Sequence, residues 1–234
     1  MATARVPMPD QALTQIAILA KAPIAGWAKT RLIPALGAPG AARLQRQFTR
    51  QAVHTAQAAA LGPVTLWCAP QVGHRFFRAL QRTTGVACRA QPDGDLGERM
   101  HSAFRLHCAD SPLLLIGTDC PALRLAHLQQ AAQALNDGAD AVFIPAEDGG
   151  YCLVGLRQPQ PALFLGMTWS HAGVMSETRR RAAVLGLTQC ELATLWDVDL
   201  PQDLARLAAL NAVDVDVDVE AQAFAGLRPR PGPA

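Results

Sequence analysis

Short apolar runs alternate with longer stretches of helical period along most of the chain, and this alternation constrains the fold more than any other feature. Runs such as 16–20, 64–68 and 113–116 have the length of strands, and a stretch with the period of a helix follows each of them. Strands that alternate with helices in this way build an α/β domain with a mostly parallel central sheet flanked by helices. We therefore expect an α/β fold.

The same pattern continues almost to the C-terminus. Strands are expected at 16–20, 64–68, 86–90, 113–116, 141–144, 151–156 and 189–195. Helices are expected at about 39–61, 72–82, 96–108, 125–136 and 171–187, with a last one opened by Pro201. A chain of 234 residues without internal repeats or a linker fits one domain, which we place at residues 15–211. We expect a flexible N-terminus at residues 1–14 and, at residues 212–234, a tail of alternating Asp and Val that forms an edge strand or an exposed acidic end.

The composition excludes several classes of protein. Half of the residues are hydrophobic and 17% are charged, which does not fit a disordered chain. A formal net charge of +2 gives no reason to expect nucleic acid as a partner. No apolar run approaches the roughly 18 to 20 residues of a membrane span, and the N-terminus lacks the apolar stretch of a signal peptide, so we expect a cytoplasmic location. The six cysteines are spread singly without the spacing of a zinc site, which indicates reduced and mostly buried thiols.

Only two of the 21 basic residues are lysines, and both lie in KAPIAGWAKTRL, directly after the first expected strand. In open α/β sheets ligands bind beyond the carboxyl ends of the strands, so this position favours a role in binding. The segment combines cations with a glycine that lets backbone N–H groups approach an anion, which predicts a cradle for phosphate groups. It is not a Walker A loop, because Ala28 stands where that loop has the glycine before its lysine. The candidate phosphate-binding residues are Lys21, Gly26, Lys29, Thr30 and Arg31, and a solvated basic loop is the alternative.

A second candidate is the loop QPDGDLG, which follows the strand expected at 86–90. Its glycines allow it to press against a flat base or another substrate, and the candidate residues are Gln91, Gly94, Leu96 and Gly97. Turns of this composition are common, so a turn that ends in the N-cap of the next helix is an equally supported interpretation.

Four aspartates follow later strands and are candidates for chemistry that needs carboxylates. Asp119, in GTDCPAL, comes soon after an apolar run, where it can hold a divalent metal against a phosphate or cap a helix. Asp197 and Asp199 alternate around a valine, so on a strand both would project to one face and repel each other unless a cation neutralised them. Asp199 could equally cap the last helix. Asp148 begins a tight turn with two glycines that leads into the strand expected at 151–156.

Five segments carry a resemblance to a known family: KAPIAGWAKTRL, QPDGDLGERM, GTDCPAL, EDGGYCLVGL and WDVDLPQDL. Together and in this order they resemble the bacterial DUF2064 family, and the resemblance covers roughly residues 15–211. That family is described as glycosyltransferase-A-like (GT-A-like) or nucleotide-diphospho-sugar transferase-like, and it is similar to the phospholactate and molybdenum cofactor guanylyltransferases. The resemblance implies a single-domain, Rossmann-like nucleotide-diphospho-sugar transferase fold.

The resemblance also implies roles for individual residues. In such folds the loop after the first strand holds the nucleotide phosphates, and the loop of Gln91 to Gly97 contacts the base. An aspartate at the end of a central strand, here Asp119, binds Mg²⁺ or Mn²⁺, and Asp199 in DLPQDL completes the metal site with Asp197 as an assistant. The segment DGGY lies where relatives meet the acceptor. The chain departs from the pattern in lacking the signature G-G-x-G-x-R, in Trp27, and in a histidine at position 171 where a threonine is expected.

The residues and the resemblance together predict a Mg²⁺-dependent transferase that uses a nucleoside triphosphate or a nucleotide sugar. The favoured reaction is nucleotidyl transfer to a phosphorylated small-molecule acceptor with release of pyrophosphate, in which Lys21, Lys29 and Arg31 stabilise the phosphates. Glycosyl transfer from a nucleotide sugar, with Asp148 as the base, is the alternative reaction. A third candidate is a protein that keeps the fold and binds a nucleotide without turnover. The sequence leaves the base, the acceptor and the oligomeric state open.

Overall fold

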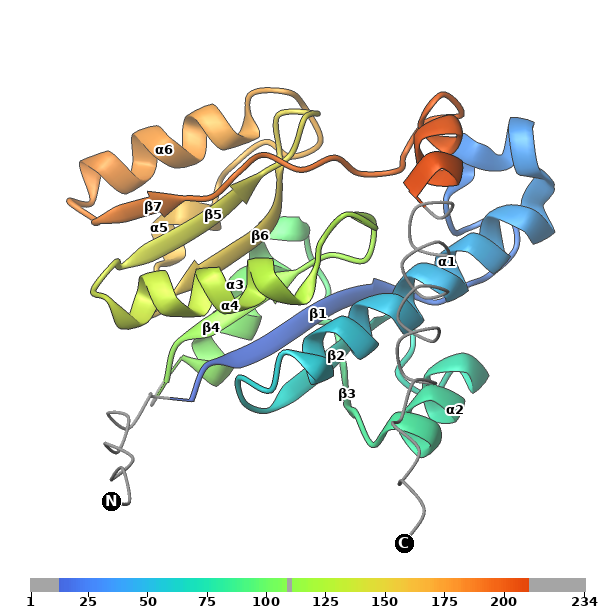
Figure 1. Cartoon of the computed structure of the whole chain (residues 1–234), viewed down its shortest axis with the longest axis horizontal. Coiled ribbons are helices and arrows are strands. Elements are labelled where there is room, and N and C mark those ends of the chain that lie inside the picture. The colour runs from blue at the N-terminus through green and yellow to red at the C-terminus, as the bar shows by residue number, and fades with distance from the viewer. Residues whose placement is uncertain (1–12, 109–110, 211–234) are drawn as a thin grey trace, which may run out of the picture.

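The computed structural model describes residues 13–108 and 111–210, which form three layers, with a central sheet and helices on both of its faces (Figure 1). This confirms the expected single α/β domain. The expectations for most of the N-terminus, at residues 1–12, and for the tail after residue 210 lie outside the described residues.

The sheet of the described residues has seven strands in the order β3-β2-β1-β4-β6-β5-β7. They are β1 (Gln15–Lys21), β2 (Val64–Ala69), β3 (Ala87–Ala90), β4 (Leu113–Ile116), β5 (Ala141–Pro145), β6 (Tyr151–Leu156) and β7 (Gln189–Glu191). Neighbouring strands are parallel except for β6, which runs antiparallel to both β4 and β5. The mostly parallel sheet is thus confirmed.

The direction of β6 follows from the short turn before it. Only residues 146–150 separate β5 from β6, whereas a parallel connection would need a crossover of about a dozen residues or more. In this turn the Asp148 carboxylate accepts a hydrogen bond from the backbone N–H of Gly150 (2.8 Å). Gly149 has φ +89°, and a Cβ there would clash with the carbonyl of Ala172, so only glycine fits. The tight turn expected at Asp148 is confirmed.

Helices cover both faces of the sheet (Figure 1). One face packs against α1 (Ile33–Ala58), α2 (Arg75–Thr84) and α4 (Leu125–Asn136). The other packs against α3 (Leu96–His107), α5 (Pro161–Phe164) and α6 (Val174–Val184). A 3₁₀ helix, η1 (Thr30–Leu32), precedes α1, and residues 203–210 are helical. Every side chain of β4 is buried, as its continuous apolar run indicates for a strand covered on both faces.

Two boundaries differ from the sequence-based expectation. Helix α6 begins at Val174 because the preceding residues form a separate turn, in which Ser170 has φ +65° and the His171 ring accepts a hydrogen bond from a backbone N–H. The last strand stops at Glu191. Asp197 and Asp199 therefore lie on irregular chain, and the strand argument for their common face was wrong.

The loops after β1 and β4 leave the sheet at the point where its connections change direction. From β1 the chain runs outward to β2 and β3, and from β4 it runs to β5 and β6 on the opposite side. Such a switch point is where open α/β sheets bind their ligands. A ligand is therefore expected to bind at the carboxyl ends of these two strands.

Two expectations from composition can also be compared with the structure. All six cysteines are free thiols, and three of them, Cys68, Cys108 and Cys152, are buried. Among the described residues no helix has both the length and the apolarity that crossing a bilayer requires.

Candidate functional site

Three segments that are far apart in the sequence meet near the carboxyl ends of β1 and β4. They are the loop 22–32 after β1, the loop 117–124 after β4, and residues 195–203. The backbone N–H of Val198 donates to the carbonyl of Asp119 (2.9 Å), which holds the third segment against the second. The structure therefore brings the predicted phosphate loop and the predicted metal-binding aspartates into one junction.

Lys29 is the centre of this junction. Its ammonium nitrogen Nζ lies 2.9 Å from Oδ1 of Asp119 and 3.1 Å from Oδ1 of Asp199, and it donates to the carbonyl of Val198 at 2.6 Å. The lysine side chain is only 4% exposed, whereas those of Asp119 and Asp199 are 47% and 38% exposed. Because an ammonium has three N–H donors, these three oxygens use all of them. A buried cation thus lies between the two aspartates.

The backbone takes an uncommon conformation to place Lys29 there. Its φ of 48° and ψ of 46° lie in the left-handed region, which residues with a Cβ rarely adopt. Such a conformation persists only where surrounding contacts stabilise it, and it is frequent at functional sites. The ring of Phe48 on α1 adds a further contact, with its centroid 5.6 Å from Nζ.

Asp119 is oriented by hydrogen bonds that reach into α1. The hydroxyl of Thr118 donates to Oδ1 of Asp119 (3.2 Å), and the buried amide of Gln45 donates to the hydroxyl of Thr118 (3.0 Å). The same amide contacts the hydroxyl of Thr49 at 3.3 Å. Sequence reasoning missed Gln45 and Thr118. The available signal was a pair of polar residues, Gln45 and Thr49, at helical spacing within an otherwise apolar face of α1.

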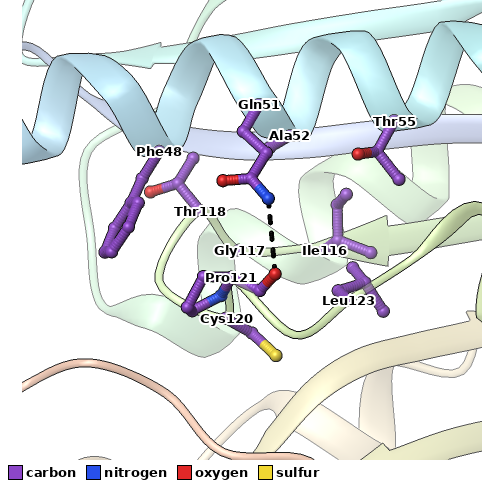
Figure 2. Close-up of a pocket in the computed structure, with 10 residues that line it drawn as sticks. All are labelled: Phe48, Gln51, Ala52, Thr55, Ile116, Gly117, Thr118, Cys120, Pro121 and Leu123. Carbon is purple, nitrogen blue, oxygen red and sulfur yellow. Dashed lines mark hydrogen bonds between the residues drawn. The ribbon is translucent and has the colours of Figure 1, made fainter. Parts of the chain in front are cut away.

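The loop that carries Asp119 is also fastened to α1 further along. Figure 2 shows the side chain of Gln51 reaching from α1 to the carbonyl of Pro121, to which it donates a hydrogen bond of 3.3 Å. The cavity beside this contact holds about 10 Å³, which is room for roughly one water molecule and not for a substrate. This side of the loop is therefore packed against α1 and leaves no room for a substrate.

Asp199 is held from two sides. Its backbone N–H donates to the carboxylate of Asp203 (2.9 Å), which also accepts from the N–H of Leu200 (2.7 Å). Nη1 of Arg31 lies 3.6 Å from Oδ2 of Asp199. The carboxylate that accepts hydrogen bonds from the backbone N–H groups ahead of the last helical segment is therefore that of Asp203 and not that of Asp199. The Asp199 side chain instead pairs with Lys29 and Arg31.

Asp197 lies close to further negative charge. Burial, together with the charges of Asp148 and Asp199, raises the pKa of Asp197 to about 6, while the ammonium of Lys29 opposes this rise. Asp148 itself is exposed. The junction thus contains more carboxylate than Lys29 and Arg31 neutralise, so an added positive charge would be favourable here.

A pocket of about 280 Å³ opens among the loops that follow β1, β2 and β3. Its polar and aromatic lining includes Lys21, Trp27, Gln91 and Arg99. The amide of Gln91 donates to the carbonyls of Ala20 (3.1 Å) and Trp67 (2.8 Å), which fixes that side chain across the ends of β1 and β2. The indole of Trp27 is 73% exposed. Of the two lysines, the pocket contains Lys21, and the junction contains Lys29.

The structure does not bring all candidates of the QPDGDLG loop to this pocket. Gly94, Leu96 and Gly97 are absent from the described residues that line it. Asp95 and Glu98 form a capping box at the start of α3, which confirms the helix-cap interpretation of this loop. Gly97 is buried, and a Cβ there would clash with the carbonyl of Phe164 and the ring of Trp169. Gly26 and Thr30, from the loop after β1, are exposed.

The donor set around Lys29 fits a hard divalent cation only in part. The described residues contain no group of three or more His, Cys, Asp or Glu side chains arranged to hold a metal ion. Two carboxylates and a carbonyl do surround a positive charge, and oxygen is the ligand that Mg²⁺ prefers. Mg²⁺ commonly takes one or two carboxylates from a protein and the remaining ligands from phosphates and water. The residues therefore fit a metal ion that is bound together with a phosphate ligand.

The fold is that of the GT-A-like nucleotide-diphospho-sugar transferases. A solved structure from Desulfovibrio desulfuricans G20, provisionally described as a nucleotide-diphospho-sugar transferase, is similar with a TM-score of 0.73 and 28% identity, over 81% of this chain and 83% of that one. The chain belongs to the DUF2064 family, described as "Uncharacterized protein conserved in bacteria", whose model matches residues 37–171. The family resemblance is thus confirmed.

Two more distant solved structures share the fold. The 4-diphosphocytidyl-2C-methyl-D-erythritol synthase of Anaerococcus prevotii DSM 20548 has a TM-score of 0.60 and 8% identity, over 87% of this chain and all (100%) of that one. Glucosyl-3-phosphoglycerate synthase of Mycobacterium tuberculosis, in complex with Mn²⁺, uridine diphosphate and glucosyl-3-phosphoglycerate, has a TM-score of 0.51 and 9% identity, over 83% and 75%. At such identities the likeness concerns the fold alone. No curated protein sequence matches the chain.

Proposed function

We propose that this protein is a Mg²⁺-dependent transferase that moves a nucleotidyl group from a nucleoside triphosphate to a phosphorylated small molecule. The observation that carries the proposal is the junction in which Asp119 and Asp199 flank one cation beside the loop after β1. Paired carboxylates at this edge of an α/β sheet suit the binding of a divalent ion against phosphates. The transferase description of the Desulfovibrio protein supports the same class.

The pocket beside the junction supports a nucleotide as the donor. A volume of about 280 Å³ suits a base with its ribose and is close to the lower limit of small-molecule pockets. The indole of Trp27 offers a flat apolar face to a base. The ammonium of Lys21 and the guanidinium of Arg99 can pair with phosphate oxygens. The pocket therefore combines the contacts that the two halves of a nucleotide require.

Asp119 and Asp199 would hold the metal ion, with Asp197 as a third carboxylate nearby. When bound, the ion would neutralise phosphate charge and polarise the reacting phosphorus centre. Thr118 already orients the carboxylate of Asp119, and Asp203 holds the backbone of Asp199; this preorganisation lowers the cost of binding.

In the proposed reaction an oxygen of the acceptor phosphate attacks the α-phosphorus in line. A new P–O bond forms while the bond from the α-phosphorus to the bridging oxygen breaks, and pyrophosphate leaves with the electron pair. A phosphate acceptor is already ionised near neutral pH, so no general base is required. Lys21, Lys29 and Arg31 contribute by positioning the phosphates and by neutralising charge.

Glycosyl transfer from a nucleotide sugar is the second candidate, and the position of Asp148 favours it. This carboxylate is exposed, and it is near enough to Asp197 for its charge to raise that residue's pKa. An exposed carboxylate beside the site could accept a proton from an acceptor hydroxyl. The two reactions differ in product, since nucleotidyl transfer releases pyrophosphate and glycosyl transfer releases a nucleoside diphosphate.

Thermal shift with individual nucleoside triphosphates and nucleotide sugars, with and without Mg²⁺, tests the proposal. We expect at least one of them to raise the Tm of the wild type only when Mg²⁺ is present, and this rise to be lost in Asp119→Ala. The matched control is Asp137→Ala, which removes an exposed aspartate at the end of α4 and should keep the rise.

An equal Mg²⁺-dependent rise in Asp119→Ala and in the wild type would show that the metal assignment is wrong. A product assay on the stabilising ligand then separates the candidates. Pyrophosphate supports nucleotidyl transfer, and a nucleoside diphosphate supports glycosyl transfer. Binding without turnover of any phosphorylated or hydroxyl acceptor supports a binding protein that has kept the fold.

A further inference from the structure

The Lys29 ammonium occupies the place between Asp119 and Asp199 that a divalent ion would need. Its nitrogen lies 2.9 Å and 3.1 Å from the two carboxylate oxygens, and its third donor is used by the carbonyl of Val198. A second cation among these oxygens would lie within a few ångströms of the ammonium, where like charges repel strongly because the site is partly buried. While Lys29 stays in place, Oδ1 of each aspartate is paired with the ammonium, and its charge disfavours a free metal ion between the two carboxylates.

We propose that Lys29 is a built-in counter-ion that keeps the metal site closed until a polyphosphate arrives together with the metal. This inference rests on the proposed function. The phosphate oxygens then accept hydrogen bonds from the ammonium of Lys29. The carboxylate oxygens of Asp119 and Asp199, which the ammonium leaves, bind the metal ion. Each ligand removes an obstacle to the other, so metal and polyphosphate bind with positive coupling. Metal alone binds weakly.

The exposure of the three side chains permits this exchange. The lysine is 4% exposed and lies behind the carboxylates, which are 47% and 38% exposed and can be approached from solvent. Lysine carries its charge on a flexible four-carbon stem, so the ammonium can move while the backbone stays in place. When the ammonium leaves, the hydrogen bond from Thr118 still orients the Asp119 carboxylate, and the bond from the Asp199 backbone to Asp203 still holds the backbone of Asp199.

The excess negative charge of the junction favours the replacement of the ammonium by a divalent ion. The carboxylates of Asp197 and Asp148 lie near the Lys29 pair and add negative charge there. A lysine that remained in place would leave this charge unneutralised. A divalent ion that replaces the ammonium adds one further positive charge at the same point and relieves the repulsion.

Binding of Mn²⁺ alone, measured by electron paramagnetic resonance on the whole protein, tests the inference. In Lys29→Met the side chain ends one atom short of the ammonium position and carries no charge. The place between the carboxylates of Asp119 and Asp199 is therefore free for a metal ion. We expect this variant to bind Mn²⁺ alone roughly tenfold or more tightly than the wild type does. The matched control is Lys21→Met, which removes the other lysine and should bind Mn²⁺ alone as weakly as the wild type.

The variants also locate the bound ion. Adding Asp119→Asn to Lys29→Met should return the affinity for Mn²⁺ to the wild-type level, because one of the two carboxylates that bind the ion is lost. The inference is overturned if the wild type binds Mn²⁺ alone as tightly as Lys29→Met. It is equally overturned if the double variant keeps the tight binding, since the ion then lies elsewhere. Neither measurement needs a nucleotide, so a failure of the proposed function does not produce these results.

A second measurement uses the wild type and does not depend on the folding of a variant. The chain contains only two lysines, so labelling lysine with ¹³C at Cε gives one set of signals for Lys21 and one for Lys29. The spectrum of Lys21→Met assigns them. We expect the Lys29 signal to stay unchanged with Mg²⁺ alone and to shift with Mg²⁺ and inorganic pyrophosphate together. A shift of Lys29 with Mg²⁺ alone would overturn the inference, and no shift of either lysine with the pair would count against the proposed function.

Discussion

The two lysines of this chain lie in one short loop, yet their surroundings differ in almost every respect. Lys29 has a side chain that is 4% exposed and an ammonium bound by three oxygens. Lys21 is exposed at the end of β1 and lines the pocket, and no hydrogen bond or ion pair within the described residues holds its ammonium. All three donors of Lys29 are used by the protein, so a phosphate can pair with this ammonium only after it leaves the two carboxylates. A cation with unused donors is available to a ligand.

The difference arises from the path of the chain. Lys21 is the last residue of a regular strand, so the pleat of β1 determines where its side chain points. Lys29 follows a loop and adopts a left-handed backbone conformation that turns its side chain into the protein. Two residues of one type, in one motif, thus have different surroundings and different contacts.

Lys29→Arg should have the largest effect among the variants that distinguish the two lysines. A planar guanidinium does not fit a slot shaped for an ammonium between two carboxylates and a carbonyl, although the charge is kept. We expect turnover with the nucleotide identified by the binding screen to fall by about 100-fold. The larger side chain should also lower the free energy of unfolding by about 1 to 3 kcal/mol. Steady-state kinetics and denaturant unfolding measure the two effects.

The same substitution at Lys21 is the control. Lys21 lines an open pocket, where arginine can pair with phosphate oxygens as lysine does, so Lys21→Arg should keep nucleotide affinity within about threefold. Equal losses in the two variants would mean that the buried and the exposed lysine are not distinguished by their surroundings, and the comparison would fail.

Much of the fold could be predicted because it depends on patterns that are local in the sequence. The apolar run of β4 and the period of α4 gave their boundaries to the residue, since a continuous apolar run between turns has few alternatives. The tight turn at Asp148 followed from its two glycines. The end of the last strand did not follow, because nothing in residues 192–195 indicates where pairing with β5 stops.

The contacts within the site could be predicted only in part. The positions of Asp119 and Asp199 after buried segments indicated that both belong to the ligand-binding edge, and they do lie together. That Lys29 would lie between them could not be inferred, because this depends on a single left-handed residue and on a contact between segments far apart in the sequence. Gln45 is a similar case, since its partner Thr118 is known only from the packing of α1 on the loop after β4. Folding, and not spacing, makes such pairs.

Lys21→Met should have the next largest effect and should act on binding alone. Without the exposed ammonium the pocket loses a charge-assisted contact to phosphate, so we expect nucleotide affinity to fall by about tenfold. The free energy of unfolding should not change, because no described residue depends on this side chain. Titration calorimetry and denaturant unfolding measure the two quantities. A loss of stability comparable to that expected for Lys29→Arg would contradict the division between the two lysines.

Asp197→Asn should have the smallest effect and should depend on pH. In the folded protein the pKa of Asp197 is raised to about 6, chiefly by burial, so the folded state favours the protonated carboxyl. Its contribution to stability is therefore complete below its ordinary pKa and is lost as the pH rises through about 6. Asparagine cannot ionise, so without metal or nucleotide the variant should match the wild type near about pH 4 and be more stable near about pH 7, by on the order of 1 kcal/mol after allowance for solvent screening.

The dependence of this effect on Lys29 connects it to the comparison of the two lysines. The Lys29 ammonium opposes the rise in the pKa of Asp197, so the stabilisation by Asp197→Asn should be larger when Lys29→Met is also present. Lys21→Met, in the pocket, should leave the stabilisation as it is in the wild type. Denaturant unfolding of the single and double variants at both pH values measures these differences. A stabilisation that does not change with pH, or that responds equally to the loss of either lysine, would show that the charge of Lys29 does not act on Asp197.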